Sequence, residues 1–119
     1  VLPTNHIFEK WHNFPHERSK LLELLKFTNK PVVILSGDRH KAGLYKKDNI
    51  IEMTSSSLNK PISRPLSIIW DIFSKESDPL LIRDMYYKEN YGVLKILPDK
   101  KMTIQLKDLN GNEVFSYKM

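Results

Sequence analysis

The hydrophobic and polar positions of residues 16–30 repeat with the period of an α-helix. Its predicted apolar face consists of Leu21, Leu22, Leu24, Leu25 and, at the margin, Phe27. Pro15 suits the helix entry, and Glu17 places negative charge in the first turn, where the helix dipole favours it. Asn29, which precedes a lysine and a proline, is a suitable stop.

Residues 32–35, Val-Val-Ile-Leu, form an unbroken and mostly β-branched run, which predicts a strand buried on both faces. A helix followed by such a strand is half of an α/β unit. Residues 42–47 and 49–56 predict two further short strands, joined by a turn at residues 47–49.

The last third of the chain alternates between apolar and polar residues, as strands do. Residues 91–98 and 101–109 predict two strands with a turn at Asp99-Lys100 between them. Asn110-Gly111 is a strong signal for a two-residue hairpin into a last strand at 112–119. We therefore expect an antiparallel β-meander at the end of the chain.

The middle of the chain has a weaker pattern. Residues 55–65 have the composition of a loop, residues 66–75 predict a short amphipathic helix, and residues 79–90 are ambiguous. We interpret about 60–88 as a variable insertion. The predicted fold class is α/β, in the wider sense α+β: a helix, a buried strand, a mixed sheet and the terminal antiparallel meander.

Composition narrows the class of protein. The 119 residues suffice for one modest domain. No apolar run approaches roughly 20 residues, so no membrane span is predicted. The absence of cysteine excludes disulfides and thiolate chemistry. The net charge of +5 comes from scattered lysines without an arginine-aromatic stripe, so we expect a solvated surface and no nucleic-acid binding.

Charged residues follow the predicted buried strand directly, at Gly37-Asp38-Arg39-His40. In an extended segment, side chains two residues apart point the same way, so Asp38 and His40 are expected to converge. Ligands usually bind at this rim of an open α/β sheet. A carboxylate with an imidazole suits a divalent metal, and Arg39 beside them is a candidate phosphate clamp. The alternative is a strand end whose Asp caps a turn and whose His is a surface group.

Five stretches together resemble the C-terminal part of the alkaline phosphatase D-like (PhoD-like) metallophosphatases of the calcineurin-like phosphoesterase superfamily. They are EKWHNFPHERSKLLELL, VVILSGDRH, IIEMTSSSLN, ENYGVLKI and IQLKDLNGNEVF, in the order of that family. The resemblance implies a part of the metallophosphoesterase β-sandwich and hydrolysis of phosphate monoesters or diesters. It covers residues 62–88 poorly, as a variable insertion would.

The resemblance also implies roles for three residues. His40 stands where the superfamily has a metal ligand in its last metal-binding motif, and Asp38 stands where many relatives carry another His. Asp38 is therefore expected either to bind metal or to orient His40. We assign catalytic roles to Asp38 and Arg39, the latter from its chemistry alone. Ser55, Ser56, Ser57 and Asn59 resemble a block that follows the site and are expected to support the loop by hydrogen bonds.

The sequence departs from the superfamily in what it lacks. The cofactor implied is a dinuclear centre of divalent or trivalent metal ions, but Gly-Asp-x-x-Asp and Gly-Asn-His motifs are missing, and Gly111-Asn112-Glu113 does not replace them. We therefore expect residues 1–119 to be the C-terminal part of a larger phosphatase domain, inactive alone. The alternative is a non-catalytic interaction domain derived from this fold.

The roles predicted for several other residues are less specific. His6, His12 and His16 are expected to be surface or packing histidines, with an approach to the metal site as the alternative. Trp11 and Phe14 are expected to pack as a plug. A truncated sheet predicts an exposed apolar patch, through which copies of the chain would form a homo-oligomer.

Overall fold

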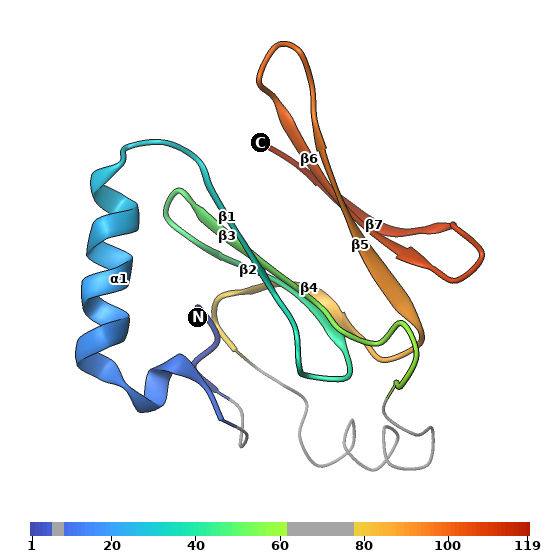
Figure 1. Ribbon diagram of the computed structural model, residues 1–119, viewed down its shortest axis with the longest axis horizontal. Coiled ribbons are helices and arrows are strands. Elements are labelled where there is room, and N and C mark those ends of the chain that lie inside the picture. Colours follow the sequence, from blue (N-terminus) through green and yellow to red (C-terminus); the bar gives the residue numbers. More distant parts are fainter. Residues whose placement is uncertain (6–8, 62–77) are drawn as a thin grey trace.

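The computed structural model describes residues 1–5, 9–61 and 78–119, and these form three layers. Figure 1 shows α1 on one side of a first sheet, and the sheet of β5, β6 and β7 on its other side. The fold is therefore mixed α/β in the broad sense predicted, with one α-helix and two sheets among the described residues. The predicted helix at 66–75 lies outside the described residues.

Helix α1 spans Pro15–Phe27, close to its predicted range. Pro15 occupies the first turn and Glu17 is the acidic residue there, as expected. Asn29 has a left-handed backbone (φ 49°), which is typical of a residue that ends a helix. The apolar face is narrower than predicted. Leu22 and Leu25 pack against the first sheet, whereas Leu24 is exposed and Phe27 is 91% exposed.

The first sheet has the order β1-β3-β2-β4, with bounds Val32–Ser36, Ala42–Lys47, Ile50–Ser55 and Leu81–Tyr86 for β1 to β4. Strand β1 pairs with β3 in parallel, and the other pairs are antiparallel. The mixed sheet is as predicted. Strand β4 lies in the stretch with the ambiguous pattern and joins the edge of the sheet through β2.

The prediction that residues 32–35 form a fully buried strand is wrong in part. Strand β1 is an edge strand of the described sheet, and Leu35 is 63% exposed. The buried positions belong instead to β3 and the first four residues of β2. The β-branched run identified the strand, but neighbouring strands decide which strand is central, and a single strand's sequence does not contain that information.

The second sheet is the predicted antiparallel meander, with β5 at Asn90–Ile96, β6 at Met102–Asp108 and β7 at Glu113–Lys118. The loop after β6 spans residues 109–112 and is longer than the predicted two-residue turn. Gly111 supplies its left-handed position (φ 81°). Gly92 lets the two sheets approach closely, because a Cβ there would lie 2.5 Å from the Met53 methyl carbon.

Two apolar cores hold the layers together. One lies between the sheets and includes Leu44, Met53, Ile104 and Leu106. The other lies beneath α1 and is formed by Leu2, Tyr45 and Ile50 together with partly buried leucines of the helix. Alternate residues of β3 serve the two cores, as the two-residue period of a strand requires. Helix α1 is thereby fixed with its first turn beside the carboxyl end of β1 (Figure 1).

Candidate functional site

A cavity of about 530 Å³ lies where β1 ends. One wall comes from the start of α1 and the turn before it, and includes Trp11, Phe14 and Glu17. The facing wall is the end of β1 with the residues that follow it, from Ser36 to Arg39, and Glu52 of β3. The position agrees with the rule that open α/β sheets bind ligands at the carboxyl ends of their parallel strands.

The Gly37-Asp38-Arg39-His40 segment is not extended, so the predicted convergence of Asp38 and His40 is wrong. Asp38 (φ 63°) and His40 (φ 52°) both have left-handed backbones. Asp38 and Arg39 line the cavity, whereas His40 does not. The alternation that holds in a strand does not hold across this turn. Left-handed non-glycine residues are unfavourable and concentrate at functional sites.

The imidazole of His40 is exposed and has a defined orientation. Its Nδ1 lies 2.7 Å from the carbonyl oxygen of Lys60. A carbonyl only accepts hydrogen bonds, so Nδ1 carries the proton and donates it. In the neutral ring, Nε2 is then the nitrogen with a lone pair. This arrangement is the one that metal-binding histidines use, with the second nitrogen donating to a backbone carbonyl.

Ser56 holds the backbone on both sides of His40. Its hydroxyl accepts a hydrogen bond from the N–H of Arg39 (2.9 Å) and donates one to the carbonyl of Lys41 (3.3 Å). The prediction that these serines support the loop after β1 by hydrogen bonds is therefore confirmed for Ser56. Ser55 donates to Asn90 Oδ1 instead (2.9 Å) and so ties β3 to β5.

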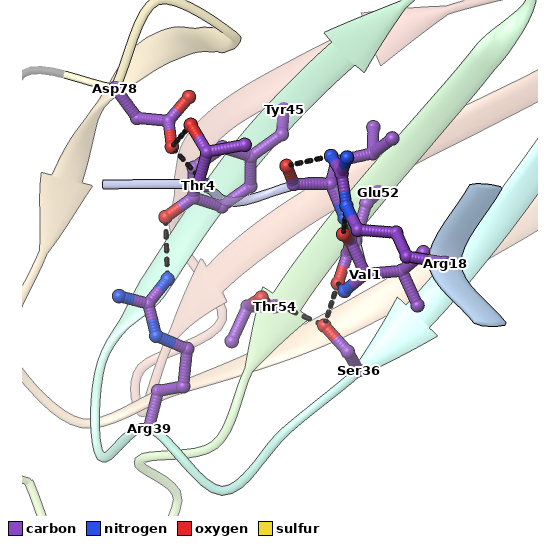
Figure 2. Close-up of polar contacts among 10 residues, drawn as sticks. Val1, Thr4, Arg18, Ser36, Arg39, Tyr45, Glu52, Thr54 and Asp78 are labelled. Atoms are coloured by element: carbon purple, nitrogen blue, oxygen red, sulfur yellow. Dashed lines mark hydrogen bonds and ion pairs between the residues drawn. The ribbon is translucent and has the colours of Figure 1, made fainter. Parts of the chain in front are cut away.

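Arg39 points back over the first sheet. Figure 2 shows its guanidinium directed at the hydroxyl of Tyr45, to which Nη1 donates at 2.6 Å. Because Tyr45 is fully buried, it fixes the position of the guanidinium beside the cavity. Arg39 and Asp38 both line the cavity, as does the carboxylate-bearing Glu52, while the Arg39 guanidinium is turned toward Tyr45.

Glu52 is a buried carboxylate that the sequence analysis missed. It is 1% exposed, lines the cavity, and accepts hydrogen bonds from Ser36 Oγ (2.8 Å), from the nitrogen of Val1 (2.8 Å) and from the N–H of Leu2. Ser36 donates to a group that only accepts, so it receives its other bond from Thr54 (2.8 Å). Figure 2 shows this network. The signal was a single acidic residue inside the apolar run Ile-Ile-Glu-Met.

The first five residues are tied to the site by two more polar side chains. Arg18 donates from Nε to the carbonyl of Val1 and from Nη2 to that of Leu2, both at 2.9 Å. Asp78 accepts from the N–H groups of Thr4 (2.5 Å) and Asn5 (3.0 Å). Arg18 therefore ties the first two residues to α1.

The pKa of Asp78 reflects these contacts. Burial raises the pKa of this carboxyl, but hydrogen bonds from the N–H groups of Thr4, Asn5 and Leu80 and from the Thr4 hydroxyl outweigh burial and lower it below its ordinary value. Asp78 is therefore a charged clamp between the N-terminal segment and the start of β4.

Two aromatic residues differ from expectation. Trp11 and Phe14 are not a packed plug, since they are 44% and 54% exposed and line the cavity. Trp11 lies in a short 3₁₀ turn, η1 (Trp11–Asn13), directly before α1. These two rings give the cavity an apolar wall.

No three His, Asp or Glu side chains gather into a metal-binding group within the described residues. His12 and His16 are both exposed, and His12 lies in a separate groove between α1 and the β2–β3 turn. His6 lies outside the described residues. Among the described helices, none is long and apolar enough to cross a membrane.

Comparison of the chain with protein-family models, with curated proteins and with solved structures finds no match.

Proposed function

We propose that this chain is the C-terminal part of a metal-dependent phosphoesterase that resembles the PhoD-like metallophosphatases. In this proposal His40 is a metal ligand, Asp38 binds metal or acts near it, and Arg39 attracts the phosphate group of an ester. The chain is inactive alone and hydrolyses phosphate monoesters or diesters only when the rest of the domain completes the centre. The five resembling stretches motivate the proposal.

The observation that carries the proposal is the hydrogen bond between His40 Nδ1 and the Lys60 carbonyl. It leaves Nε2 as the basic nitrogen, and it does so on a turn that follows a parallel strand. Asn29, Asp48 and Lys100 also have left-handed backbones away from the site, so the orientation of the His40 ring, and not its backbone, supports the proposal. The clamp by Ser56 further supports a defined position for this ring.

The residues present fit such a centre only in part. A zinc ion takes about four ligands, and a two-metal centre takes more. Only His40 and Asp38 are candidates on this turn, and Asp38 and His40 are directed to different surroundings. The remaining ligands would come from other polypeptide. A bound dinuclear centre would supply Lewis-acid activation of the phosphate and a hydroxide nucleophile.

Zinc titration of the chain with ¹⁵N-labelled histidine tests the proposal. Without metal, the His40 ring is expected in the Nδ1–H tautomer, and zinc is expected to shift its Nε2 resonance at lower concentration than those of His12 and His16. His40→Ala should abolish the first binding event, while His16→Ala, which removes an exposed helix histidine, should not. An Nε2–H tautomer, or equal response of all histidines, would refute a ligand role for His40.

Activity provides the second part of the test. In a protein that contains the completed domain, His40→Ala is expected to lower metal content and to reduce phosphoesterase activity by at least about a hundredfold. His16→Ala is again the matched control. Unchanged activity in His40→Ala would reject the proposal.

A second candidate function is a non-catalytic interaction module or homo-oligomer. It is favoured by apolar residues exposed on the described surface, above all Phe27 on α1 and Leu35 on the edge strand β1. Sedimentation equilibrium at rising protein concentration tests the homo-oligomer, and the zinc response of His40 separates the two candidates, because a truncated phosphatase sheet would also associate. Association that Leu35→Lys abolishes would support a homo-oligomer formed through β1, and a monomer at high concentration would reject it.

A further inference from the structure

Strand β1 has one edge to which no strand is bound among residues 1–5, 9–61 and 78–119. Within these residues it pairs only with β3, so it ends the first sheet on that side. Natural sheets usually protect such an edge with a charged residue, a proline or a bulge. The five residues Val32–Ser36 contain no charge and no proline, and their pairing with β3 is regular. The edge is therefore suited to pairing with a further strand.

The hydrogen bonds of β1 show which backbone groups are directed to this edge. The N–H of Val32 donates to the carbonyl of Asn49 (3.0 Å), on the side of β3. Successive residues of a strand direct their backbone groups to opposite sides, so Ile34 also faces β3. Val33 and Leu35 therefore direct their N–H and C=O groups outward, where an added strand would bond to them.

Leu35 is exposed where this edge meets the second sheet. Its side chain is 63% exposed, and it lines a cavity of about 190 Å³ together with Met53 of β3 and Gly92 of β5. Val33, two residues earlier on the same face, packs against the core between the sheets. An apolar side chain placed beside Leu35 by an added strand would therefore extend that apolar surface.

The sequence around β1 is complementary to itself in one antiparallel register. A two-fold axis at Ile34, perpendicular to the sheet, sets Val33 of one copy opposite Leu35 of the other. Both residues have outward backbone groups, so a hydrogen-bonded pair forms on each side of the axis. Two residues beyond the strand ends, the same register sets Lys30 opposite Asp38. Opposite charges thus meet at both ends of the interface.

The neighbouring registers lack this agreement. An axis between two residues would oppose an outward-facing residue to an inward-facing one. An axis at Val33 would separate Lys30 from Asp38 and set Pro31, which has no N–H, opposite Leu35. An axis at Leu35 would set the carboxylate of Asp38 opposite the apolar Val32. Charge and hydrogen bonding therefore both favour the axis at Ile34.

We propose that the edge of β1 binds the β1 edge of a second copy of this chain, antiparallel and with its two-fold axis at Ile34. The four described strands of each first sheet then form one sheet of eight. Because Asp38 lines the cavity at the end of β1, Lys30 of the second copy adds a positive charge at the rim of that cavity. The inference rests on the second candidate function, and it adds the partner, the symmetry and the register.

Single cysteines test the register, because the chain has no cysteine of its own. Ile34→Cys places both thiols at the axis, where opposite Cα atoms lie about 4.5 Å apart and a disulfide can close. In a glutathione redox buffer this variant is expected to form a disulfide-linked dimer at least about tenfold faster than Val32→Cys. Val32→Cys is the matched control on the same strand and face, since its two thiols would lie roughly 14 Å apart.

Charge reversal tests the ends of the interface without changing a core residue. Lys30 is exposed, and Lys30→Glu would set a negative charge opposite Asp38 at both ends of the interface. This change is expected to raise the dimer dissociation constant about tenfold in sedimentation equilibrium. Adding Asp38→Lys restores opposite charges and should restore most of the affinity. Lys118→Glu makes the same change of charge on exposed β7 and should have no effect.

Equal crosslinking of Ile34→Cys and Val32→Cys, or an equal effect of Lys30→Glu and Lys118→Glu, would overturn the inference. If the chain still associates, the homo-oligomer of the second candidate function survives that result, whereas a monomer at high concentration would reject both. Loss of crosslinking in a longer protein that contains the completed domain would show that another segment occupies the edge, and would overturn the inference there. The zinc response of His40, measured on the unchanged chain, decides the phosphoesterase proposal separately.

Discussion

The β5–β7 sheet and the carboxyl end of β1 are held by contacts of very different range along the chain. In the sheet, each strand pairs with the next, and Asp108 accepts hydrogen bonds from residues only two and four positions away. At the end of β1, Leu2 and Glu52 are 50 residues apart and Thr4 and Asp78 are 74 apart. Strands next to one another in sequence form the first region, and the second is assembled from five separate parts of the chain.

This difference determines how each region responds to damage. We expect a meander of adjacent strands to tolerate loss of any one polar contact, because its pairing does not depend on distant segments. The end of β1 depends on buried polar groups whose partners arrive from far away, and an unsatisfied buried group is expensive. We therefore expect apolar changes to weaken both regions together, and polar changes to release the N-terminal segment and the turn alone.

Leu106→Ala is expected to have the largest effect. Leu106 is fully buried in the core between the two sheets, so its truncation leaves a cavity and should lower the free energy of unfolding by about 3 kcal/mol. Val114→Ala on the more exposed strand β7 is the control and should cost less than about 1 kcal/mol. Urea unfolding measures both. A biphasic transition in Leu106→Ala would show that the two sheets do not unfold together.

Glu52→Gln is expected to lower the stability of the N-terminal segment by about 2 kcal/mol and to leave the second sheet unchanged. The amide keeps the shape of the side chain, but in either orientation its NH₂ group faces a donor, the N–H of Leu2 or the nitrogen of Val1, which then has no acceptor. Amide hydrogen exchange should rise for residues 2–5 and stay unchanged in β5 and β6. Glu113→Gln on exposed β7 should change neither. Equal protection losses in both sheets would contradict the separation of the two regions.

The comparison also explains what the sequence could predict. Helix α1, strands β2 and β3, and the whole meander follow from local periodicity and turn residues such as Asn29. The cavity could not be predicted, because Trp11 and Asp38 meet only through tertiary packing. The sequence motif identified the turn after β1, but the geometry predicted for it was wrong. That prediction assumed an extended backbone with alternating side chains, and the left-handed Asp38 and His40 break the alternation. The only sequence signal for Glu52 was an acidic residue inside an apolar strand.

Asp78 makes the clamp of the N-terminal segment sensitive to pH. Its hydrogen bonds lower its pKa in the folded state despite burial, so its contribution to stability is present above the pKa of the unfolded chain. That contribution is lost as pH falls through the lowered folded pKa, below about pH 4. Asp78→Asn should cost about 1.5 kcal/mol at pH 7 and should flatten this acid dependence.

The matched control for this change lies in the other region. The pKa of Asp99 is also lowered, chiefly by its contact with the Lys101 side chain, but Asp99 lies in the exposed turn between β5 and β6. Asp99→Asn should leave amide exchange of residues 2–5 unchanged at every pH. Release of these residues by both changes would show that acid acts on the whole fold and not on the clamp.

Ser56→Ala is expected to have the smallest effect on stability and the most specific effect on the site. The change removes the bonds to the Arg39 N–H and the Lys41 carbonyl, which should cost about 1 kcal/mol. Because these bonds flank His40, the ring should lose its single Nδ1–H tautomer, and the zinc response of its Nε2 should weaken. Ser56→Thr retains the hydroxyl and should restore both. If Ser56→Ala leaves the tautomer unchanged, the Lys60 carbonyl orients His40 without help from the clamp. The long-range polar contacts would then stabilise the turn without setting its chemistry.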